Sequence, residues 1–337
     1  MSPIHFKEQG WGFLKNLLAT ERAVVLCDSN TKVCLDHLHL SCSETANLPV
    51  IEIPAGEENK KLKTCEKAWY ELTELGADRK TVLLNLGGGV VTDLGGFVAS
   101  TYMRGIRFVQ IPTSTLGMAD AAIGGKTGVD FGGLKNMIGT FSQPEAVLID
   151  VNFLKTLPQR HYRNGLAEIL KHAFIFDSAI PDLMYANEDE LISRSVDAKM
   201  KIVTADEFES GERKKLNFGH TLGHAIESHF LESETSVFHG EAIAAGMIME
   251  SFISKSVCNL NDADFSSVAT MVDSIFKRLV LTETDWTEIK RLLIHDKKNR
   301  DGEVKFVLLS KIGEAKIDQS VSEQLLDDAL VYYSAKA

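Results

Sequence analysis

A change of pattern near Leu157 and Pro158 divides the chain into two parts. Before it, short runs rich in β-branched residues alternate with amphipathic helical segments. After it, helical spacing continues with almost no strand-like sequence. Strands that alternate with helices pair in parallel sheets, because each helix returns the chain to the end of the sheet where the previous strand began. We therefore predict a Rossmann-like α/β domain over residues 1–157, followed by a mainly α-helical domain over residues 158–337.

The individual elements follow from hydrophobic periodicity and from the turn residues between them. In the first domain we expect five strands, at 23–27, 50–53, 81–86, 108–111 and 146–149. Two helices are expected there, at about 61–75 and 93–100. In the second domain we expect helices around 164–176, 187–204, 216–231, 240–258, 264–279 and 285–294, with one late strand at 304–309.

Composition and charge limit the classes of partner. Among the 337 residues, 44% are hydrophobic and 25% are charged, as in soluble globular proteins. The net charge of −11 argues against nucleic acid and against an anionic membrane as partners. The five cysteines are odd in number and form no CxxC pair, and no signal pattern or long apolar run occurs. We expect a cytoplasmic protein with reduced thiols.

Glycine is concentrated in one segment. Thirteen of the 25 glycines lie in the 53 residues from Gly87 to Gly139. Glycine is costly to order, so such a cluster is kept where the backbone turns tightly or approaches a ligand. Lysines and carboxylates are interspersed in the same segment. This combination is typical of a site that handles phosphate, and it makes an enzyme the leading hypothesis.

The three glycines at 87–89 stand between a predicted strand and a predicted helix. The free N–H groups and the dipole at a helix start favour a pyrophosphate there. The segment is not the GxGxxG fingerprint of dinucleotide-binding folds, so a plain tight turn remains an alternative. Asp28 ends another strand, and Glu57 and Lys60 could contact the adenosine end of a dinucleotide. For these three residues, spacing alone favours a solvated loop.

Three histidines and a glutamate suggest a metal site. His220 and His224 are four residues apart and share one helical face, and His239 follows at the start of the next expected helix. Glu168 lies on an earlier helix. Catalytic zinc commonly takes three protein ligands, His₂Glu among them, although a histidine on an apolar helix is more often structural. Spacing does not decide which two histidines bind, and the obvious pair is His220 with His224.

Basic residues are scattered along the chain. Taken singly, each is more often a solvated surface charge, but several stand beside glycine or in apolar surroundings. A cluster of them would suit a substrate that carries both phosphate and carboxylate. These residues are Arg104, Lys126, Lys135, Lys171, Lys199, Arg213 and Lys297.

Longer motifs resemble one enzyme family. GGGVVTDLGGFVASTYMRG, VQIPTSTLGMADAAIGGKTGV, GGLKNMIG, NGLAEILK, DEFESGERKKLNFGHTLGHAIE, FHGEAIAAGM and DKKNRDG resemble the 3-dehydroquinate synthases, in the right order over nearly the whole chain. The resemblance implies a dehydroquinate synthase-like fold, NAD, one divalent metal (zinc, with cobalt as the alternative) and a homodimer. It also implies a carbon–oxygen lyase of the shikimate pathway. Such a lyase converts 3-deoxy-D-arabino-heptulosonate 7-phosphate to 3-dehydroquinate and phosphate by transient oxidation, elimination, reduction and aldol ring closure.

The resemblance also implies roles for individual residues. The metal ligands would be Glu168, His220 and His239, which differs from the pair suggested by spacing. The catalytic residues would be Lys126, Lys171, Asp120, Asn136 and His224, the last a phosphate-side residue that handles a proton. Substrate contacts would be Arg104, Lys199, Arg213, Asn217 and Lys297 or Lys298. NAD contacts would be Asp28, Asn30, Glu57, Lys60, Gly88, Gly89, Val90, Asp93, Thr113, Ser114, Lys126, Lys135, Phe153, Thr156 and Asn164.

Five positions depart from the commoner family pattern. Thr92 and Gly95 stand where glycine and alanine are usual, and Ser114 replaces a threonine while keeping the hydroxyl. Asp130 stands where asparagine is frequent, and Ala173 replaces a glycine. None removes a residue that the chemistry needs.

Three alternative functions remain open at this point. A metal- and NAD-dependent polyol dehydrogenase of the same fold should lack the basic cluster. A related sugar-phosphate cyclase that makes a valiolone or an inosose would keep the cofactors and change the substrate contacts. Lys199, Asn217 and His224, with the intact GGKTG segment, favour dehydroquinate synthase over it. A non-catalytic NAD-binding protein fits least, because all three metal-ligand positions are present.

Overall fold

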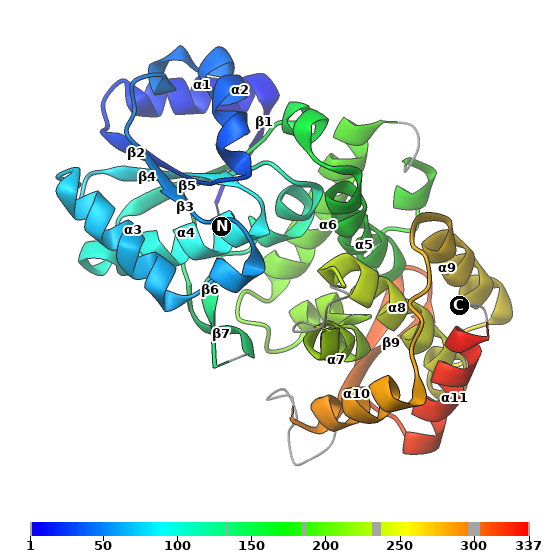
Figure 1. Ribbon diagram of the computed structural model, residues 1–337. Coiled ribbons are helices and arrows are strands. Elements are labelled where there is room, and N and C mark those ends of the chain that lie inside the picture. Colours follow the sequence, from blue (N-terminus) through cyan, green and yellow to red (C-terminus); the bar gives the residue numbers. More distant parts are fainter. Residues whose placement is uncertain (1, 133, 184–186, 231–236, 296–303, 336–337) are drawn as a thin grey trace. The chain divides into compact units, whose positions relative to one another are not determined.

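The chain forms two compact units, Met1–Tyr162 and Arg163–Ala337. The computed structural model describes residues 2–132, 134–183, 187–230, 237–295 and 304–335 (Figure 1). The division falls in the first turn of helix α5 (Gln159–Ile175), a few residues beyond the change of sequence pattern.

A six-stranded parallel sheet forms the centre of the first unit, in the order β1-β8-β5-β4-β2-β3. Strands β2, β4 and β8 are buried along their whole length, which a parallel sheet requires because helices cover both faces. The strands are β1 (Ile4–Phe6), β2 (Ala23–Asp28), β3 (Val50–Ile53), β4 (Val82–Gly87), β5 (Arg107–Pro112) and β8 (Ala146–Ile149). The five predicted strands are confirmed, and the three-residue β1 was not predicted.

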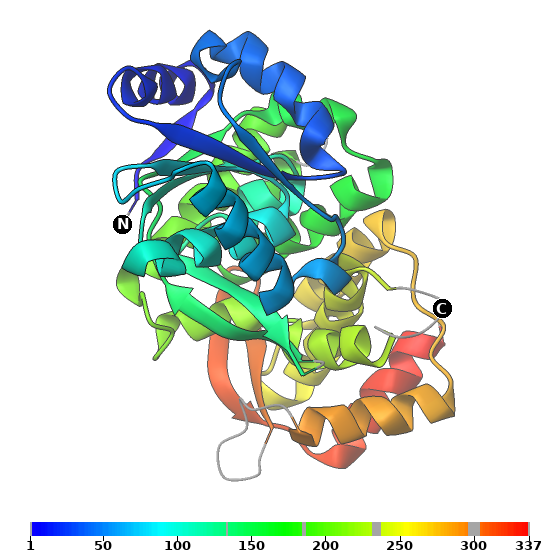
Figure 2. The ribbon, with the colours of Figure 1, turned by 60° about the vertical axis from the view of Figure 1, so that its left-hand side comes forward.

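Helices lie on both faces of this sheet (Figure 1). Two of them, α1 (Lys7–Leu18) and α2 (Cys34–Ser41), lie on one face, and α3 (Leu62–Glu74) and α4 (Gly89–Thr101) lie on the other. An antiparallel hairpin of β6 (Lys126–Phe131) and β7 (Leu134–Phe141) packs against α4 (Figure 2). The hairpin was not predicted, because its glycines and lysines hide the alternation that marks a strand.

The second unit is mainly helical, as predicted. Its central helix α8 is apolar on nearly all sides and contacts α7, α9, α11 and β9. The helices beyond α5 are α6 (Glu188–Ala205), α7 (His220–Phe230), α8 (His239–Val257), α9 (Asp262–Ile275), α10 (Glu283–His295) and α11 (Glu323–Ser334).

The expectation of a single late strand was wrong. The described residues include an antiparallel pair, β9 (Lys305–Lys311) with β10 (Glu314–Ser320). Strand β10 is mostly exposed, so it carries little of the hydrophobic pattern that revealed β9.

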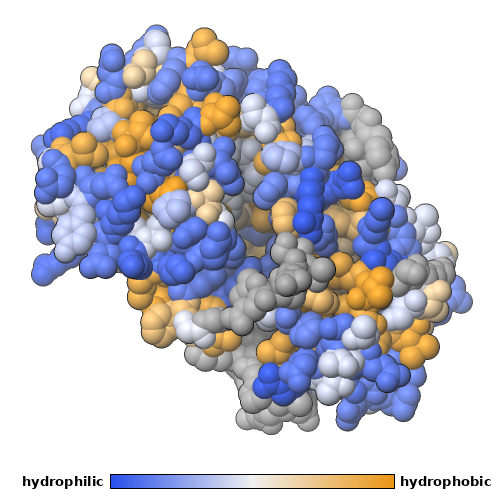
Figure 3. Space-filling view, viewed as in Figure 1, coloured by the Kyte–Doolittle hydropathy of each residue, from blue (hydrophilic) through white to orange (hydrophobic). Residues whose placement is uncertain are grey.

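Hydrophilic side chains cover most of the visible surface, interrupted by smaller hydrophobic patches (Figure 3). Within the described residues, no helix combines the length and apolar character needed to cross a membrane.

Candidate active site

The parallel sheet has a switch point between β2 and β4. From β2 the chain passes to β3 on one side, and after α3 it returns to β4 on the other side. Ligands of open α/β sheets bind beyond the carboxyl ends of the strands at such a point. Asp28 ends β2 and Gly87 ends β4. The predicted glycine turn therefore lies at the place where this topology favours a ligand.

Helix α4 begins directly after the glycine turn. Gly88 is its N-cap and Gly89 its first residue, so the helix starts four residues earlier than predicted. No side chain caps this end by a hydrogen bond in the described structure. A Cβ atom on Gly88 would lie 3.2 Å from Oγ of Ser114, so the turn packs closely against the segment after β5. The first turn of α4, which includes Val90, thus lacks a side-chain cap, and the N–H groups at such a helix start favour an anion.

The loop after β2 is fixed by Asp28. Its Oδ1 accepts hydrogen bonds from the backbone N–H groups of Asn30 and Thr31, at 2.9 and 2.7 Å. The Thr31 hydroxyl donates to the Leu86 carbonyl at 3.2 Å, which joins the ends of β2 and β4. Asp28 is only 7% exposed, so the solvated-loop interpretation was wrong for this residue. Asn30 itself is exposed in the turn.

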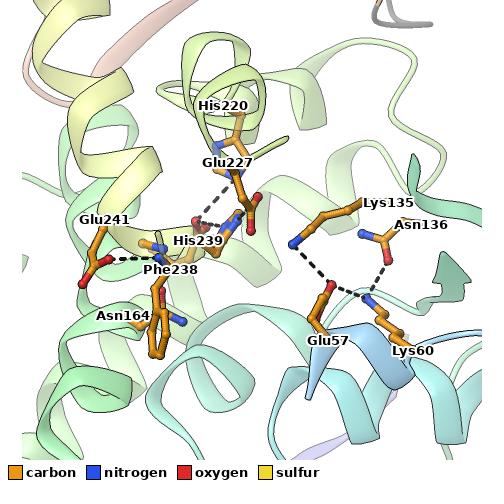
Figure 4. Close-up of polar contacts among 12 residues, drawn as sticks. Glu57, Lys60, Lys135, Asn136, Asn164, His220, Glu227, Phe238, His239 and Glu241 are labelled. Atoms are coloured by element: carbon orange, nitrogen blue, oxygen red, sulfur yellow. Dashed lines mark hydrogen bonds and ion pairs between the residues drawn. The ribbon is translucent and has the colours of Figure 1, made fainter. Parts of the chain in front are cut away.

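A buried lysine links the segment after β3 to α4 and the hairpin. The ammonium of Lys60 donates to Oδ2 of Asp93 at 2.6 Å. It also donates to Oδ1 of Asn136 at 2.6 Å (Figure 4). Lys135 pairs with Glu57 at 3.4 Å in the same network. Lys60 is 4% exposed, so a solvated loop was again the wrong interpretation. Burial alone would lower the pKa of Lys60, but Asp93 and Glu57 outweigh it and raise that pKa above its usual value.

Asp130 has a defined place in this network. Its Oδ1 accepts the backbone N–H of Asn136 at 2.7 Å, and its own N–H donates to the Lys60 carbonyl. Asn136 has a φ of +53°, in the left-handed region, and Asp130 helps to hold it there. Burial raises the pKa of Asp130. This departure from the family pattern therefore adds a carboxylate beside Lys60.

Two other positions that depart from the family pattern, Thr92 and Gly95, lie beside a buried pair of amide side chains. Nδ2 of Asn85 donates to Gln110 at 3.1 Å, and Nε2 of Gln110 donates to the Thr92 carbonyl at 2.8 Å. A Cβ atom on Gly95 would overlap the Asn85 amide. Glycine at position 95 is thus explained by the asparagine that faces it.

The remaining predicted residues of this unit lie on its turns and edges. Asp120 lies in a single π-helical turn, Gly117–Ala121, a feature often found at functional sites. Lys126 is exposed at the start of β6, and Arg104 is exposed with a φ of +71°. The N–H of Thr113 donates to the Gly87 carbonyl at 2.9 Å. In the turn Val151–Thr156, Phe153 is buried and Thr156 is exposed.

In the second unit, helices α7 and α8 cross at glycines. A Cβ atom on Gly246 would overlap the Gly219 carbonyl, and one on Gly223 would lie 3.0 Å from Cα of Ile243. Gly219 also has a φ of +77°, which favours glycine. His220 and His239 are the first residues of the two helices. Across this close crossing the rings of His220 and His239 lie 5.5 Å apart.

Both histidines face Glu168 of α5. Nε2 of His220 lies 3.4 Å from Oε1 of Glu168, and Nε2 of His239 lies 3.3 Å from the same oxygen. The three potential ligand atoms all lie within 4.8 Å of one another. Nδ1 of His220 is 3.1 Å from the Phe218 carbonyl, so that nitrogen donates and Nε2 is left to bind. Two imidazole nitrogens and a carboxylate oxygen form a donor set that fits zinc or a similar divalent ion.

Charges around this group favour ionised Glu168 and neutral His220. Burial alone would raise the pKa of Glu168, but Lys171 and His220 hold it well below its usual range. Lys171 forms a buried ion pair with this carboxylate. Burial and Lys171 lower the pKa of His220 to about 3. Burial acts against charge on His239 too, yet Glu227 and Glu168 raise its pKa to about 10. A bound cation would displace that proton.

The pair suggested by helical spacing is not the pair that faces Glu168. The His224 ring lies 4.9 Å from that of His220, and His224 forms a second group with Glu227 and His239. The i, i+4 pattern pointed to His224 because it ignores the partner helices. Glu227 was missed, and its only signal was its place one turn after His224.

Several predicted substrate residues of this unit are buried cations. Lys171, Lys199 and Arg213 are each at most 5% exposed, so the surface-charge interpretation was wrong for them. Nη1 of Arg213 donates to the Glu207 carbonyl at 2.5 Å. Asn217 donates to Glu209 at 2.7 Å.

Two predicted ligand-binding residues remain, Asn164 and Lys297. Asn164 was expected to contact the cofactor, and in the structure its Oδ1 accepts the N–H of Gly240, beside His239 (Figure 4). Lys297 lies outside the described residues, as does Lys298.

Comparison with known proteins identifies the family. Residues 50–164 match the family model described as 3-dehydroquinate synthase N-terminal, and residues 165–299 match the corresponding C-terminal model. The chain belongs to the 3-dehydroquinate synthase family. It is 37% identical to a 3-dehydroquinate synthase of Parabacteroides distasonis, over 94% of this chain and 92% of that protein.

Solved structures place the fold among related cyclases. A 2-epi-5-epi-valiolone synthase of Streptomyces hygroscopicus, with NAD⁺ and Zn²⁺ bound, is 28% identical, with a TM-score of 0.86. The match covers 100% of this chain and 98% of that one. A 2-deoxy-scyllo-inosose synthase, complexed with carbaglucose-6-phosphate, NAD⁺ and Co²⁺, is 24% identical, with a TM-score of 0.83 over 99% and 96% of the two chains, and shares the fold. The predicted dehydroquinate synthase-like fold is confirmed.

Proposed function

We propose that this chain converts 3-deoxy-D-arabino-heptulosonate 7-phosphate to 3-dehydroquinate and phosphate. Membership of the 3-dehydroquinate synthase family supports the reaction. The observation that carries the proposal is the convergence of His220 and His239 on one oxygen of Glu168. A purely structural histidine pair would not need two Nε2 atoms directed at the same buried carboxylate.

NAD fits the first unit and a divalent metal fits the second. The uncapped start of α4 and the switch point suit a pyrophosphate, and Asp28 and the Lys60 network shape the surrounding loops. Glu168, His220 and His239 would hold the metal. When bound, NAD supplies a hydride acceptor that is later regenerated, and the metal supplies a Lewis acid for a substrate oxygen.

The side chains of this protein then bind the substrate and handle protons. Buried Lys199 and Arg213, with Asn217, are proposed to bind the charged groups of the substrate. Lys171 keeps Glu168 ionised, so that its oxygen can act as a ligand. His224 is proposed to move a proton on the phosphate side. Asp120, Lys126, Asn136 and Arg104 would supply the contacts of the first unit.

A related sugar-phosphate cyclase is the second candidate, because a valiolone synthase is a close structural neighbour. The experiment that tests the proposal is incubation with the heptulosonate phosphate, NAD and zinc. Phosphate and 3-dehydroquinate should appear in equal amounts. Phosphate release from a different sugar phosphate, with none from the heptulosonate, would favour the second candidate.

We also propose a homodimer. On the β6–β7 hairpin, Phe131, Leu134 and Phe141 are each more than half exposed. Phe131 and Leu134 pair directly across the tip of the hairpin, and exposed hydrophobic side chains that lie together commonly mark protein contacts. Sedimentation analysis should give twice the 37.2 kDa mass of the chain, and a monomer at all concentrations would contradict the proposal.

The cellular location is proposed to be the cytoplasm. All five cysteines are buried free thiols, which fits a reducing compartment. Fractionation of cells that express the natural protein would test this.

A further inference from the structure

Glu227 of α7 contacts the outer side of a proposed metal ligand. Its Oε2 lies 3.2 Å from Nδ1 of His239 (Figure 4). The other ring nitrogen, Nε2, faces Glu168. Glu227 is 3% exposed. The imidazole of His239 is therefore placed between two buried carboxylates that come from different helices.

This contact determines how His239 can bind. A carboxylate only accepts hydrogen bonds, so Nδ1 of His239 must carry the proton that it donates to Glu227. Once a cation has displaced the second proton of the ring, the lone pair of Nε2 can bind that cation beside Glu168. The hydrogen bond also fixes the rotation of the ring. It makes the imidazole more basic, so that its other nitrogen binds a cation more strongly.

We propose that Glu227 is a positioning residue for the metal centre, which selects the tautomer and orientation of His239. The inference rests on the proposed ligand set of Glu168, His220 and His239. It goes beyond that set because it explains which nitrogen of His239 binds. His220 is held in the equivalent way by the Phe218 carbonyl, so each imidazole is anchored at Nδ1.

The hydrogen bond between Glu227 and His239 also favours one of two groups of potential metal ligands that share His239. His224, Glu227 and His239 also have ligand atoms within 4.8 Å of one another, so His239 belongs to both groups. A metal in that second group would take Nδ1 of His239 and make Glu227 a ligand. With Glu227 as a hydrogen-bond acceptor, the metal is instead directed to Nε2 and Glu168.

The test measures metal binding by the full-length protein without reference to turnover. Cobalt(II) is titrated into metal-free protein, and its visible absorption reports both affinity and coordination. Glu227→Gln keeps an acceptor for Nδ1–H, so cobalt affinity should fall by about 10-fold with an unchanged spectrum. Glu227→Ala removes the acceptor, so affinity should fall by about 100-fold and the spectrum should change. Glu288→Gln, an exposed control on α10, should bind cobalt like wild type.

Three outcomes would overturn parts of the account in distinguishable ways. Wild-type affinity and spectrum in Glu227→Ala would remove the positioning role. Loss of all cobalt binding in both Glu227→Ala and His224→Ala, with binding retained in Glu168→Ala, would move the metal to the second group. Normal cobalt binding with the predicted graded losses, but no dehydroquinate formed by the wild type, would refute the proposed function and leave the role of Glu227 intact.

Discussion

The ammonium of Lys60 lies 2.6 Å from Oδ2 of Asp93, although Lys60 precedes α3 and Asp93 lies inside α4. Lys60 also donates to Asn136 of the hairpin. One buried cation therefore joins three segments that are distant in sequence. Asp93 lies one turn after the glycine turn where we propose that NAD binds.

Replacing Lys60 with methionine should destabilise the first unit. The change leaves Asp93, whose side chain is 19% exposed, without its counter-charge, so the free energy of unfolding should fall by about 3 kcal/mol. The matched control is Lys67→Met on α3, which breaks an exposed pair with Glu71 and should cost less than about 1 kcal/mol. Urea unfolding compares the two variants. Equal stabilities would show that the Lys60 pair is not important for this fold.

The proposed ligand set predicts a pattern of metal content. Alanine in place of Glu168, His220 or His239 should remove most of the bound metal, because each supplies one of only three protein ligands. Alanine in place of His224 should leave the metal content near that of wild type while it lowers turnover. Elemental analysis of the purified variants measures this. Metal loss in the His224 variant, with retention in the His239 variant, would contradict the assignment.

Arg213 should affect substrate binding and turnover but not the binding of NAD or metal. Replacement by alanine removes a buried cation, and kcat/KM should fall by a factor equivalent to about 2–5 kcal/mol. Arg213→Lys keeps the charge but loses the bidentate guanidinium, so it should also be impaired. NAD and metal binding should not change. An Arg213→Lys enzyme with wild-type kinetics would make the residue peripheral, and exposed Arg291→Lys provides the matched control.

Glu250 should make stability depend on pH. Burial raises its pKa from 4.5 to about 8, although its oxygens accept N–H bonds from Gly219 and Leu222 at the start of α7. The native state thus binds this proton more tightly than the unfolded chain does. The contribution of Glu250 to stability is therefore greatest below pH 4.5 and falls as pH rises to about 8.

Glu250→Gln should remove this dependence, because the amide does not titrate. Between pH 6 and 8, the difference in free energy of unfolding between wild type and Glu250→Gln should change by about 2–3 kcal/mol. Urea midpoints at the two pH values provide the measurement. Parallel pH profiles for the two proteins would show that Glu250 does not carry the shifted pKa.

Five of the six strands of the parallel sheet and most helices could be predicted from sequence, because their burial leaves a local pattern. β2 and β4 are buried along their whole length; β2 is a continuous apolar run before an aspartate, and β4 is apolar apart from Asn85 before a glycine. The hairpin β6–β7 left no such pattern, since its identity depends on pairing between strands and on packing against α4. Strand β10 was missed for a similar reason.

The site residues were harder to predict from residue spacing. Spacing favoured His220 with His224, whereas the partner of His220 comes from the start of α8, across a helix crossing that depends on Gly219 and Gly246. Lys60 looked solvated because Asp93 and Asn136, its partners, are distant in sequence. Local patterns do not report such contacts. The family resemblance named Glu168, His220 and His239 together, and the structure brings their potential ligand atoms within 4.8 Å of one another.

The most direct test of the central claim is the number of turnovers per NAD. With NAD present at a small fraction of the heptulosonate phosphate, nearly all substrate should be converted to dehydroquinate and phosphate, because the hydride removed early is returned later. Absorbance at the NADH wavelength should show no net rise over many turnovers. Product that stops at one equivalent of NAD, with NADH accumulating in step, would contradict a cyclase and indicate a dehydrogenase.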